Sequence, residues 1–169
     1  AVDAPEDVTA TWMVRRNSFT LMKDHNDEGF KAVPCIEDVI VPLPTLGTFI
    51  HELTSILERR KITYGFHGHI GDGSFRVVPV FDFRRDDLHE SIFGLMDEVF
   101  ALIKRLRGNM SADHSDGIIR TPFLNKMFST EMLNIFKDTE HIFDPDDIFN
   151  PGKKVNPRFD IRHNIRHSN

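Results

Sequence analysis

The sequence contains a single cysteine, Cys35, among its 169 residues. One thiol excludes an intrachain disulfide and any zinc or iron–sulfur site built from cysteines of this chain. We therefore expect a reducing, cytoplasmic setting. No apolar run approaches the roughly 20 residues that span a bilayer, so no transmembrane segment is expected. The opening AVDAPEDVTAT also lacks the charged, apolar and small-residue regions of a signal peptide.

Blocks of one charge sign are also missing before the last dozen residues. The formal net charge is −5, from 21 Lys and Arg against 26 Asp and Glu. Without a basic stripe there is no electrostatic footprint for nucleic acid, and the charge is that of an ordinary soluble domain. With 40% apolar residues, the chain is long enough to bury one core and too short for two large domains.

The spacing of apolar residues predicts a mixture of helices and strands. Helical patterns occur at residues 8–22, 45–57, 88–106 and 121–138. Strand patterns occur at residues 33–41, 61–67 and 74–83. Pro79 indicates an edge or end position for the last strand, because proline cannot donate to a neighbouring strand. Two strand–helix–strand stretches predict an α+β fold: a ferredoxin-like plait, with helices on one face of an antiparallel sheet, plus a C-terminal helical and loop extension.

The terminal part differs in character from the rest. HIFDPDDIFNPGKKVNP is rich in proline and glycine, and after it Arg158, Arg162 and Arg166 recur at one-turn spacing. We expect one domain over residues 1–155 and a basic, half-ordered tail over residues 156–169. The first helical pattern starts with little introduction, so we expect a fragment of a longer chain.

The stretch HGHIGDGSFR places two histidines before a Gly-Asp-Gly turn and Arg76 on the strand that leaves it. Such a turn needs the conformational freedom of glycine at positive φ, and it brings His69 and Arg76 close. His69 is therefore a candidate metal ligand or substrate contact. The alternative is that His67 and His69 are ordinary loop histidines.

Two further segments carry weaker signals. In SADHSDG, Asp113 and His114 are adjacent, and neighbours on an extended chain point opposite ways. One of them can orient a partner while the other faces substrate, and a simple surface turn is the alternative. FDPDDIFNPGKKVNP by itself indicates only a capped terminal turn that starts at Asp144 and Pro145.

Taken together and in this order, the three segments resemble the C-terminal domain of FAD-linked oxidases of the vanillyl-alcohol-oxidase-like class. That class includes D-lactate dehydrogenases, glycolate oxidase and D-2-hydroxyglutarate dehydrogenase. HGHIGDGSFR is similar to the family pattern GHxGDGNxH, SADHSDG to SxEHGxG, and FDPDDIFNPGK to DPxxxxNPGK. IEDVIVP and the stretch from Trp12 to Arg15 also fit. The resemblance covers about residues 12–155.

The resemblance implies a flavoprotein in which this domain caps the flavin and binds a small D-2-hydroxy acid, D-lactate-like or glycolate-like. It implies that FAD is held mainly by an N-terminal domain outside this chain, which is therefore inactive alone, and it leaves the electron acceptor open. The roles that it implies are catalysis by His114, Arg76 and Asp113, substrate binding by Arg15, Arg76 and His69, and flavin contacts by Asn150 and Lys153. His114 takes the hydroxyl proton as hydride passes to the flavin.

The family's divalent metal is the point at which this sequence departs from the pattern. Arg76 stands where the family has its second histidine, and Asp113 where it has glutamate. Arginine cannot ligate a metal, so His69 and Asp113 would remain as a poor two-ligand site. We expect Arg76 to supply the positive charge instead, by clamping the substrate carboxylate. Val78 and Ile36 also differ from relatives, which leaves the particular acid open.

Two functions of other classes compete with this hypothesis. One is a non-catalytic interaction or assembly domain that retains the fold. The other is a metal-dependent hydrolase built on His67, His69, Asp113 and His114. Metal analysis separates the hydrolase from the other two, and flavin reduction separates an enzyme from a scaffold.

Overall fold

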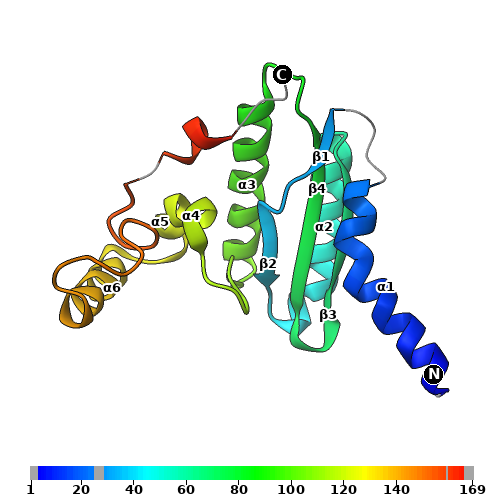
Figure 1. The fold of residues 1–169 in the computed structure, drawn as a ribbon, viewed down its shortest axis with the longest axis horizontal. Helices are drawn as coiled ribbons and strands as arrows, with labels where there is room; N and C mark the ends of the chain where they lie inside the picture. The colour runs from blue at the N-terminus through cyan, green and yellow to red at the C-terminus, as the bar shows by residue number, and fades with distance from the viewer. Residues whose placement is uncertain (1–3, 25–28, 159, 166–169) are drawn as a thin grey trace.

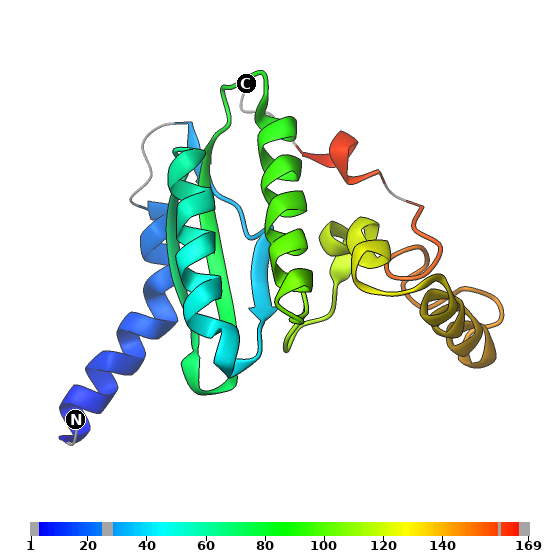
Figure 2. The same cartoon turned by 180° about the vertical axis from the view of Figure 1, so that it is seen from behind.

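The computed structural model describes residues 4–24, 29–158 and 160–165. Within them, two helices cover one face of a four-stranded antiparallel sheet (Figure 1 and Figure 2). The strands are β1 (Phe30–Ala32), β2 (Ile36–Ile40), β3 (Thr63–His69) and β4 (Ser74–Asp82). The α-helices are α1 (Pro5–Asp24), α2 (Leu46–Arg59), α3 (Leu88–Arg105), α4 (Gly117–Arg120), α5 (Leu124–Met127) and α6 (Thr130–Phe143).

Strand β4 lies at the centre of the sheet. β3 pairs with one edge of β4, while β2 and β1 pair with successive parts of the other edge. After α3 the chain returns beside β2, where Asn109 forms an antiparallel bridge with Ile40. The order β-α-β-β-α followed by this bridge is that of a ferredoxin-like plait whose last strand is reduced to one bridge. The predicted α+β fold is thereby confirmed.

The core lies between the sheet and the helices α2 and α3, which stand in front of the strands in Figure 2. The predicted apolar stripes of both helices are buried: Phe49, Leu53, Ile56 and Leu57 in α2, and Leu88, Ile92, Leu95, Val99 and Leu102 in α3. From β4, Phe75 and Val77 belong to the same core. Because side chains alternate along a strand, Arg76 between them points to the face that these helices do not cover.

The prediction that Pro79 marks an edge strand is wrong, because β4 is the central strand. The Pro79 carbonyl accepts a hydrogen bond from the Val33 N–H at 2.8 Å. The N–H and C=O of one residue point to the same side of a strand. A backbone N–H at position 79 would therefore point towards the break between β1 and β2. No strand of the described chain lies there to accept its hydrogen bond, so the sheet loses no bond when residue 79 is proline. This break also corrects the continuous strand predicted at residues 33–41.

The helical region predicted at residues 121–138 consists of a short 3-10 helix (Thr121–Phe123), α5 and α6. Ser129 separates α5 from α6, and its side chain accepts a hydrogen bond from the Met132 N–H at 3.3 Å. This N-cap starts a new helix within the predicted helical region. Before the break, the ring of Phe123 packs edge-on against Phe100 of α3 at 5.1 Å. The C-terminal extension is thus held against the plait.

The two ends of the described chain differ in how closely they pack against the sheet and its helices. α1 confirms the first predicted helix, and its N-terminal half extends away from the sheet, so that Trp12 is 49% exposed (Figure 1). In the tail, Ile161 is buried as part of the core, while the domain boundary at residue 155 stays a prediction. The side chains of Phe19 and Met22 and the whole of Arg166 lie outside the described residues. No helix in the described ranges combines the length and apolarity needed to cross a bilayer.

Candidate active site

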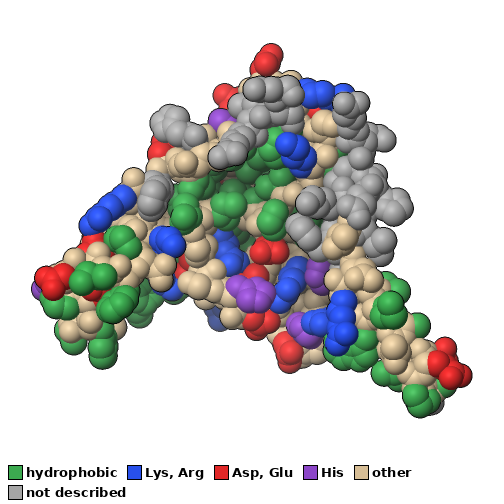
Figure 3. Space-filling view, viewed as in Figure 1, with side chains coloured by type: hydrophobic (Ala, Val, Ile, Leu, Met, Phe, Trp, Pro, Cys, Tyr) green, Lys and Arg blue, Asp and Glu red, His purple; other side chains and the backbone are tan. Residues whose placement is uncertain are grey.

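The face of the sheet opposite α2 and α3 carries the charged and histidine side chains of the first motif. In the β3–β4 register, His67 lies opposite Arg76 and His69 lies opposite Ser74, so these side chains share one face. Figure 3 shows histidine and arginine or lysine side chains gathered with carboxylates over the strands on this face. The strand pairing therefore brings the charged ends of the HGHIGDGSFR motif together.

The glycine turn between β3 and β4 fixes this pairing. Gly73 has φ +72°, and a Cβ placed there would come within 2.1 Å of the Val41 carbonyl oxygen. A Cβ at Gly68 would come within 2.2 Å of the Ser74 carbonyl oxygen. Only glycine fits at either position, because the clashing atoms belong to backbone.

Arg15 reaches the site from α1. Its Nη2 lies 3.3 Å from Nε2 of His69. A guanidinium has donors and no acceptor, so Arg15 must donate and His69 must accept through Nε2. The structure thus brings together two residues that the sequence analysis assigned to substrate binding, although they lie 54 positions apart.

His114 meets Arg76 across the sheet. Arg76 Nη2 lies 3.2 Å from His114 Nε2, although the two residues are 38 positions apart and α3 lies between them in the sequence. By the same argument Arg76 donates and His114 Nε2 accepts. The His114 side chain is 52% exposed, so it is accessible to a small molecule.

The loop that carries His114 is built around Asp38. The Asp38 carboxylate accepts hydrogen bonds from the N–H groups of Asp113 at 3.0 Å and His114 at 2.9 Å. The buried side chain of Arg120 donates to the carbonyl oxygens of Met110 at 2.9 Å and Ser115 at 2.6 Å. These bonds hold both ends of the loop, so the position of the His114 backbone is tightly defined.

Asp113 shares this loop, but its side chain is exposed. Among the described residues no group of three His, Cys, Asp or Glu side chains is arranged to hold a metal ion. The four residues of the hydrolase hypothesis, His67, His69, Asp113 and His114, therefore do not form such a group. A metal held by His69 and Asp113 alone stays a prediction.

The positive charges of the site affect the pKa of His67. Burial lowers the pKa of His67 below its ordinary value of 6.5, and the nearby charges of Arg76 and Arg15 lower this pKa further. The part of this shift that comes from Arg76 and Arg15 reflects their positive charge, because cations disfavour protonation of a neighbouring imidazole. A positively charged, partly exposed surface suits an anionic ligand.

Residues 1–154 match the family described as FAD linked oxidases, C-terminal domain. The chain belongs to this family. The match spans the plait, the Arg76–His114 contact and the NPGK segment.

Three curated relatives illustrate the membership of this family. The chain is 29% identical over 127 residues to the D-2-hydroxyglutarate dehydrogenase of Haemophilus influenzae, and the match covers 75% of this chain and 12% of the relative. It is 28% identical over 123 residues to glycolate oxidase subunit GlcD of Bacillus subtilis, covering 73% and 26%. It is 26% identical over 117 residues to a D-lactate dehydrogenase of Anaerostipes hadrus, covering 69% and 25%. The chain thus spans about a quarter or less of the length of these flavoprotein oxidoreductases.

The family implies FAD, and the NPGK segment offers groups for it. Asn150 and Lys153 are exposed, and Lys153 Nζ donates to Asn150 Oδ1 at 2.9 Å. An ammonium and an amide fit the acceptor atoms at the edge of an isoalloxazine ring. The next residue, Lys154, forms an ion pair with buried Asp116 at 2.8 Å. The segment that would contact FAD is therefore attached to the loop that carries His114.

Two residues of this family domain were missed by sequence reasoning. Asp38 and Arg120 received no role, although IEDVIVP, which contains Asp38, was recognised as fitting the family. That motif was the signal that could have identified Asp38. No comparable signal marked Arg120, because its partners are carbonyl groups brought near it by folding.

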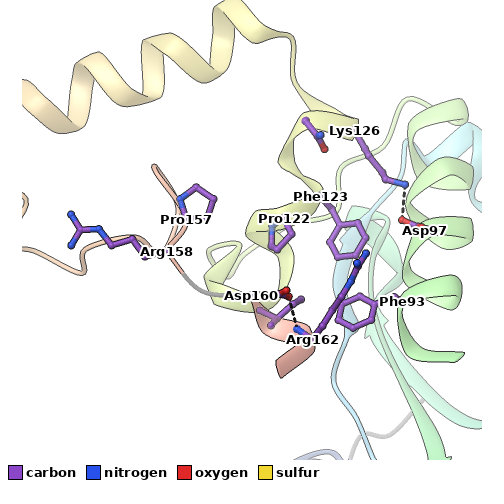
Figure 4. A pocket seen from close by; sticks show the side chains of 11 residues that line it. Phe93, Asp97, Pro122, Phe123, Lys126, Pro157, Arg158, Asp160 and Arg162 are labelled. Carbon is purple, nitrogen blue, oxygen red and sulfur yellow. Dashed lines mark hydrogen bonds and ion pairs between the residues drawn. The ribbon is translucent and has the colours of Figure 1, made fainter. Parts of the chain in front are cut away.

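A separate cavity of about 550 Å³ lies between α3, α5 and residues 157–158 and 160–162 (Figure 4). Its cations already have partners: Lys126 pairs with Asp97 at 2.6 Å, and Arg162 lies 5.3 Å from the centre of the Phe93 ring. None of the predicted site residues lines this cavity. We therefore place the candidate active site on the open face of the sheet.

Proposed function

We propose that this chain is the substrate-side domain of an FAD-dependent oxidoreductase that oxidises a small D-2-hydroxy acid. In this proposal Arg76 and Arg15 bind the substrate carboxylate, with His69 beside them. His114 accepts the proton of the hydroxyl group through Nε2. FAD, when bound, supplies the acceptor for the hydride that leaves the substrate carbon.

The observation that carries the proposal is the contact of 3.2 Å between Arg76 Nη2 and His114 Nε2. In a 2-hydroxy acid the carboxylate and the hydroxyl group are attached to the same carbon. A cation and a proton acceptor side by side match this pair of groups. A guanidinium binds a carboxylate through two parallel hydrogen bonds. These bonds fix the orientation of the substrate carbon that carries the carboxylate and the hydroxyl group.

The hydrogen bonding of His114 suits this role. His114 Nε2 accepts a hydrogen bond from Arg76, so in the free site its lone pair points to the guanidinium. When a substrate carboxylate binds Arg76, that lone pair becomes available to the hydroxyl proton. An imidazole nitrogen with an available lone pair is an effective general base when it lies within hydrogen-bond reach of the proton.

The surroundings of Arg76 favour a small acid. Val78 follows Arg76 on the same face of β4, is 1% exposed and offers no polar group for a second carboxylate. The relatives are named for D-2-hydroxyglutarate, glycolate and D-lactate. Of these, we propose a D-lactate-like or glycolate-like acid, which has one carboxylate.

Anaerobic flavin reduction in the full-length flavoprotein tests the proposal. Bleaching of the flavin by D-lactate or glycolate, with much slower reduction by L-lactate and D-2-hydroxyglutarate, is the expected result. His114→Gln should abolish reduction by the acid while a chemical reductant still bleaches the flavin. Fast reduction by D-2-hydroxyglutarate alone would refute the proposed substrate class. If no hydroxy acid bleaches the flavin, the enzyme assignment fails and the non-catalytic hypothesis takes its place.

A further inference from the structure

We propose that Asp38 is a positioning residue for His114, which it holds with the ring proton on Nδ1 and the lone pair on Nε2. The proposal rests on the proposed function where it concerns turnover, because there His114 is the proton acceptor. The arrangement of the ring itself can be measured without any turnover.

The environment of Asp38 is costly for an aspartate. Its side chain is 0% exposed, and its backbone has φ +63°, in the left-handed region. This conformation coincides with the register shift in the pairing of β2 with β4 between Ile36 and Val39. A buried carboxylate and a left-handed non-glycine residue both cost free energy, so they persist only where the surroundings stabilise them. The hydrogen-bond partners of Asp38 show which groups stabilise it.

Those groups belong almost entirely to the His114 loop and its anchor. The carboxylate accepts the backbone N–H groups of Asp113 and His114, and Arg120 Nη1 lies 3.3 Å from Oδ2. The Asp38 carbonyl accepts the N–H of Ala112 at 2.8 Å. Asp38 thus fixes three successive residues through its carboxylate and its carbonyl, and the imidazole leaves the backbone from a defined point.

The ring of His114 is contacted at both nitrogens. Asp38 Oδ1 lies 3.4 Å from Nδ1, which is longer than a formed hydrogen bond and close enough to orient a ring N–H. Arg76 Nη2 lies 3.2 Å from Nε2 and can only donate. In the neutral ring the proton must then be on Nδ1, facing the carboxylate. The two contacts select the same tautomer from opposite sides of the ring.

This tautomer is the one that the proposed reaction needs. Once the substrate carboxylate binds Arg76, Nε2 faces the hydroxyl group with its lone pair, while Asp38 still holds the Nδ1 proton. The hydroxyl O–H bond breaks, the proton forms an N–H bond with Nε2, and the ring becomes a cation. The buried carboxylate of Asp38 then stabilises the imidazolium that forms, as carboxylates behind catalytic histidines do.

Nitrogen NMR of the full-length flavoprotein, labelled with ¹⁵N-histidine, tests the proposal at a pH where the ring is neutral. The His114 signals are assigned by their loss in His114→Gln. We expect the Nδ1–H tautomer in the unmutated protein and a shift towards Nε2–H in Asp38→Asn. Turnover of the hydroxy acid should show kcat lowered about 10- to 100-fold in Asp38→Asn, the range for loss of a supporting hydrogen bond behind a functional histidine. KM should change little, because Arg15 and Arg76 remain.

Asp116→Asn is the matched control. Asp116 is also buried in this loop, at 4% exposure, but its partners are Ser111 Oγ at 2.7 Å and Lys154 instead of the His114 ring. Its loss should loosen the loop and leave the Nδ1–H tautomer in place. If Asp116→Asn shifts the His114 ring towards the Nε2–H tautomer as far as Asp38→Asn does, the stability of the loop determines the tautomer and Asp38 does not. The proposal is then refuted.

The remaining outcomes separate the two proposals. An Nε2–H tautomer in the unmutated protein overturns the role of Asp38, and this result does not require the Asp38→Asn variant to fold. An unchanged tautomer or an unchanged kcat in folded Asp38→Asn also overturns it. If the Nδ1–H tautomer depends on Asp38 but no hydroxy acid is oxidised, the positioning of the ring stands and the proposed reaction fails.

Discussion

Replacing Arg76 with alanine in the full-length flavoprotein tests whether a fixed cation binds the substrate carboxylate. Arg76 projects from β4 between Phe75 and Val77, which are held in the core. Its backbone should therefore keep its place when the side chain is shortened. The substitution removes the guanidinium from the site and leaves His114 without its donor at Nε2.

The expected magnitude follows from the partial exposure of Arg76. A hydrogen bond to a charged group contributes about 1.5–3 kcal/mol, and solvent screening places a half-exposed pair near the lower end, at about 1.5–2 kcal/mol. Since 1.36 kcal/mol corresponds to a factor of ten, kcat/KM should fall about 10- to 30-fold. His114→Ala should reduce kcat/KM further, because it removes the proposed proton acceptor itself.

Steady-state oxidation of the true hydroxy acid is the assay, with Arg76→Lys as the matched control. Lysine keeps the charge but cannot form two parallel hydrogen bonds, so it should restore only part of the activity. Arg76→His should not return kcat/KM to the unmutated value. Near-normal turnover of Arg76→Ala, or activity of the unmutated enzyme that a chelator removes, would refute the reasoning that arginine replaces the metal.

Three further predictions concern stability and the cofactor. Burial raises the pKa of Asp116, but hydrogen bonds from Lys154 and Ser111 outweigh this effect, and the pKa lies below its ordinary value of 3.8. Its contribution to stability is therefore complete above about pH 4 and is lost as the pH falls through the lowered pKa. The destabilisation by Asp116→Asn, measured by chemical denaturation, should shrink in acid, and an equal effect at about pH 3 and pH 7 would contradict this. Gly73→Ala should lower the free energy of unfolding by more than about 1 kcal/mol. Gly47→Ala in α2, where a Cβ meets nothing within 4 Å, should raise the free energy of unfolding by about 0.5–1 kcal/mol. Equal effects of the two substitutions would refute the argument that a Cβ at Gly73 clashes with the backbone. The 169-residue chain alone should show no flavin absorbance, and a yellow preparation with stoichiometric flavin would place the FAD site within it.

The sequence alone was sufficient where the decisive interactions are local. The apolar stripes of α2 and α3 are set by spacing within each helix, so their buried faces were predicted residue by residue. The capped turn at Asp144 was predicted for the same reason, and its carboxylate accepts the N–H groups of Ile148 at 2.9 Å and Phe149 at 2.7 Å. Short-range geometry fixes such features, whatever the rest of the chain does.

The site was only partly available from the sequence. The motifs pointed to Arg76 and His114, but their contact depends on α3 returning the chain to the edge of β2, where Asn109 bridges Ile40. Likewise, Pro79 was assigned to an edge because the break between β1 and β2 cannot be read from propensity. Strand partners are chosen by the packing of the whole sheet.

Tertiary structure alone decided the parts played by Asp38 and Arg120. In the sequence, one is an acidic residue in a strand pattern and the other a basic residue before a helix. The fold buries both, because Asp38 receives the N–H groups of the His114 loop and Arg120 donates to the carbonyl oxygens of Glu37, Met110 and Ser115. These partners lie up to 83 positions away in the chain. A polar residue is stable inside a protein only when folding brings its partners to it, and local sequence does not encode where those partners will be.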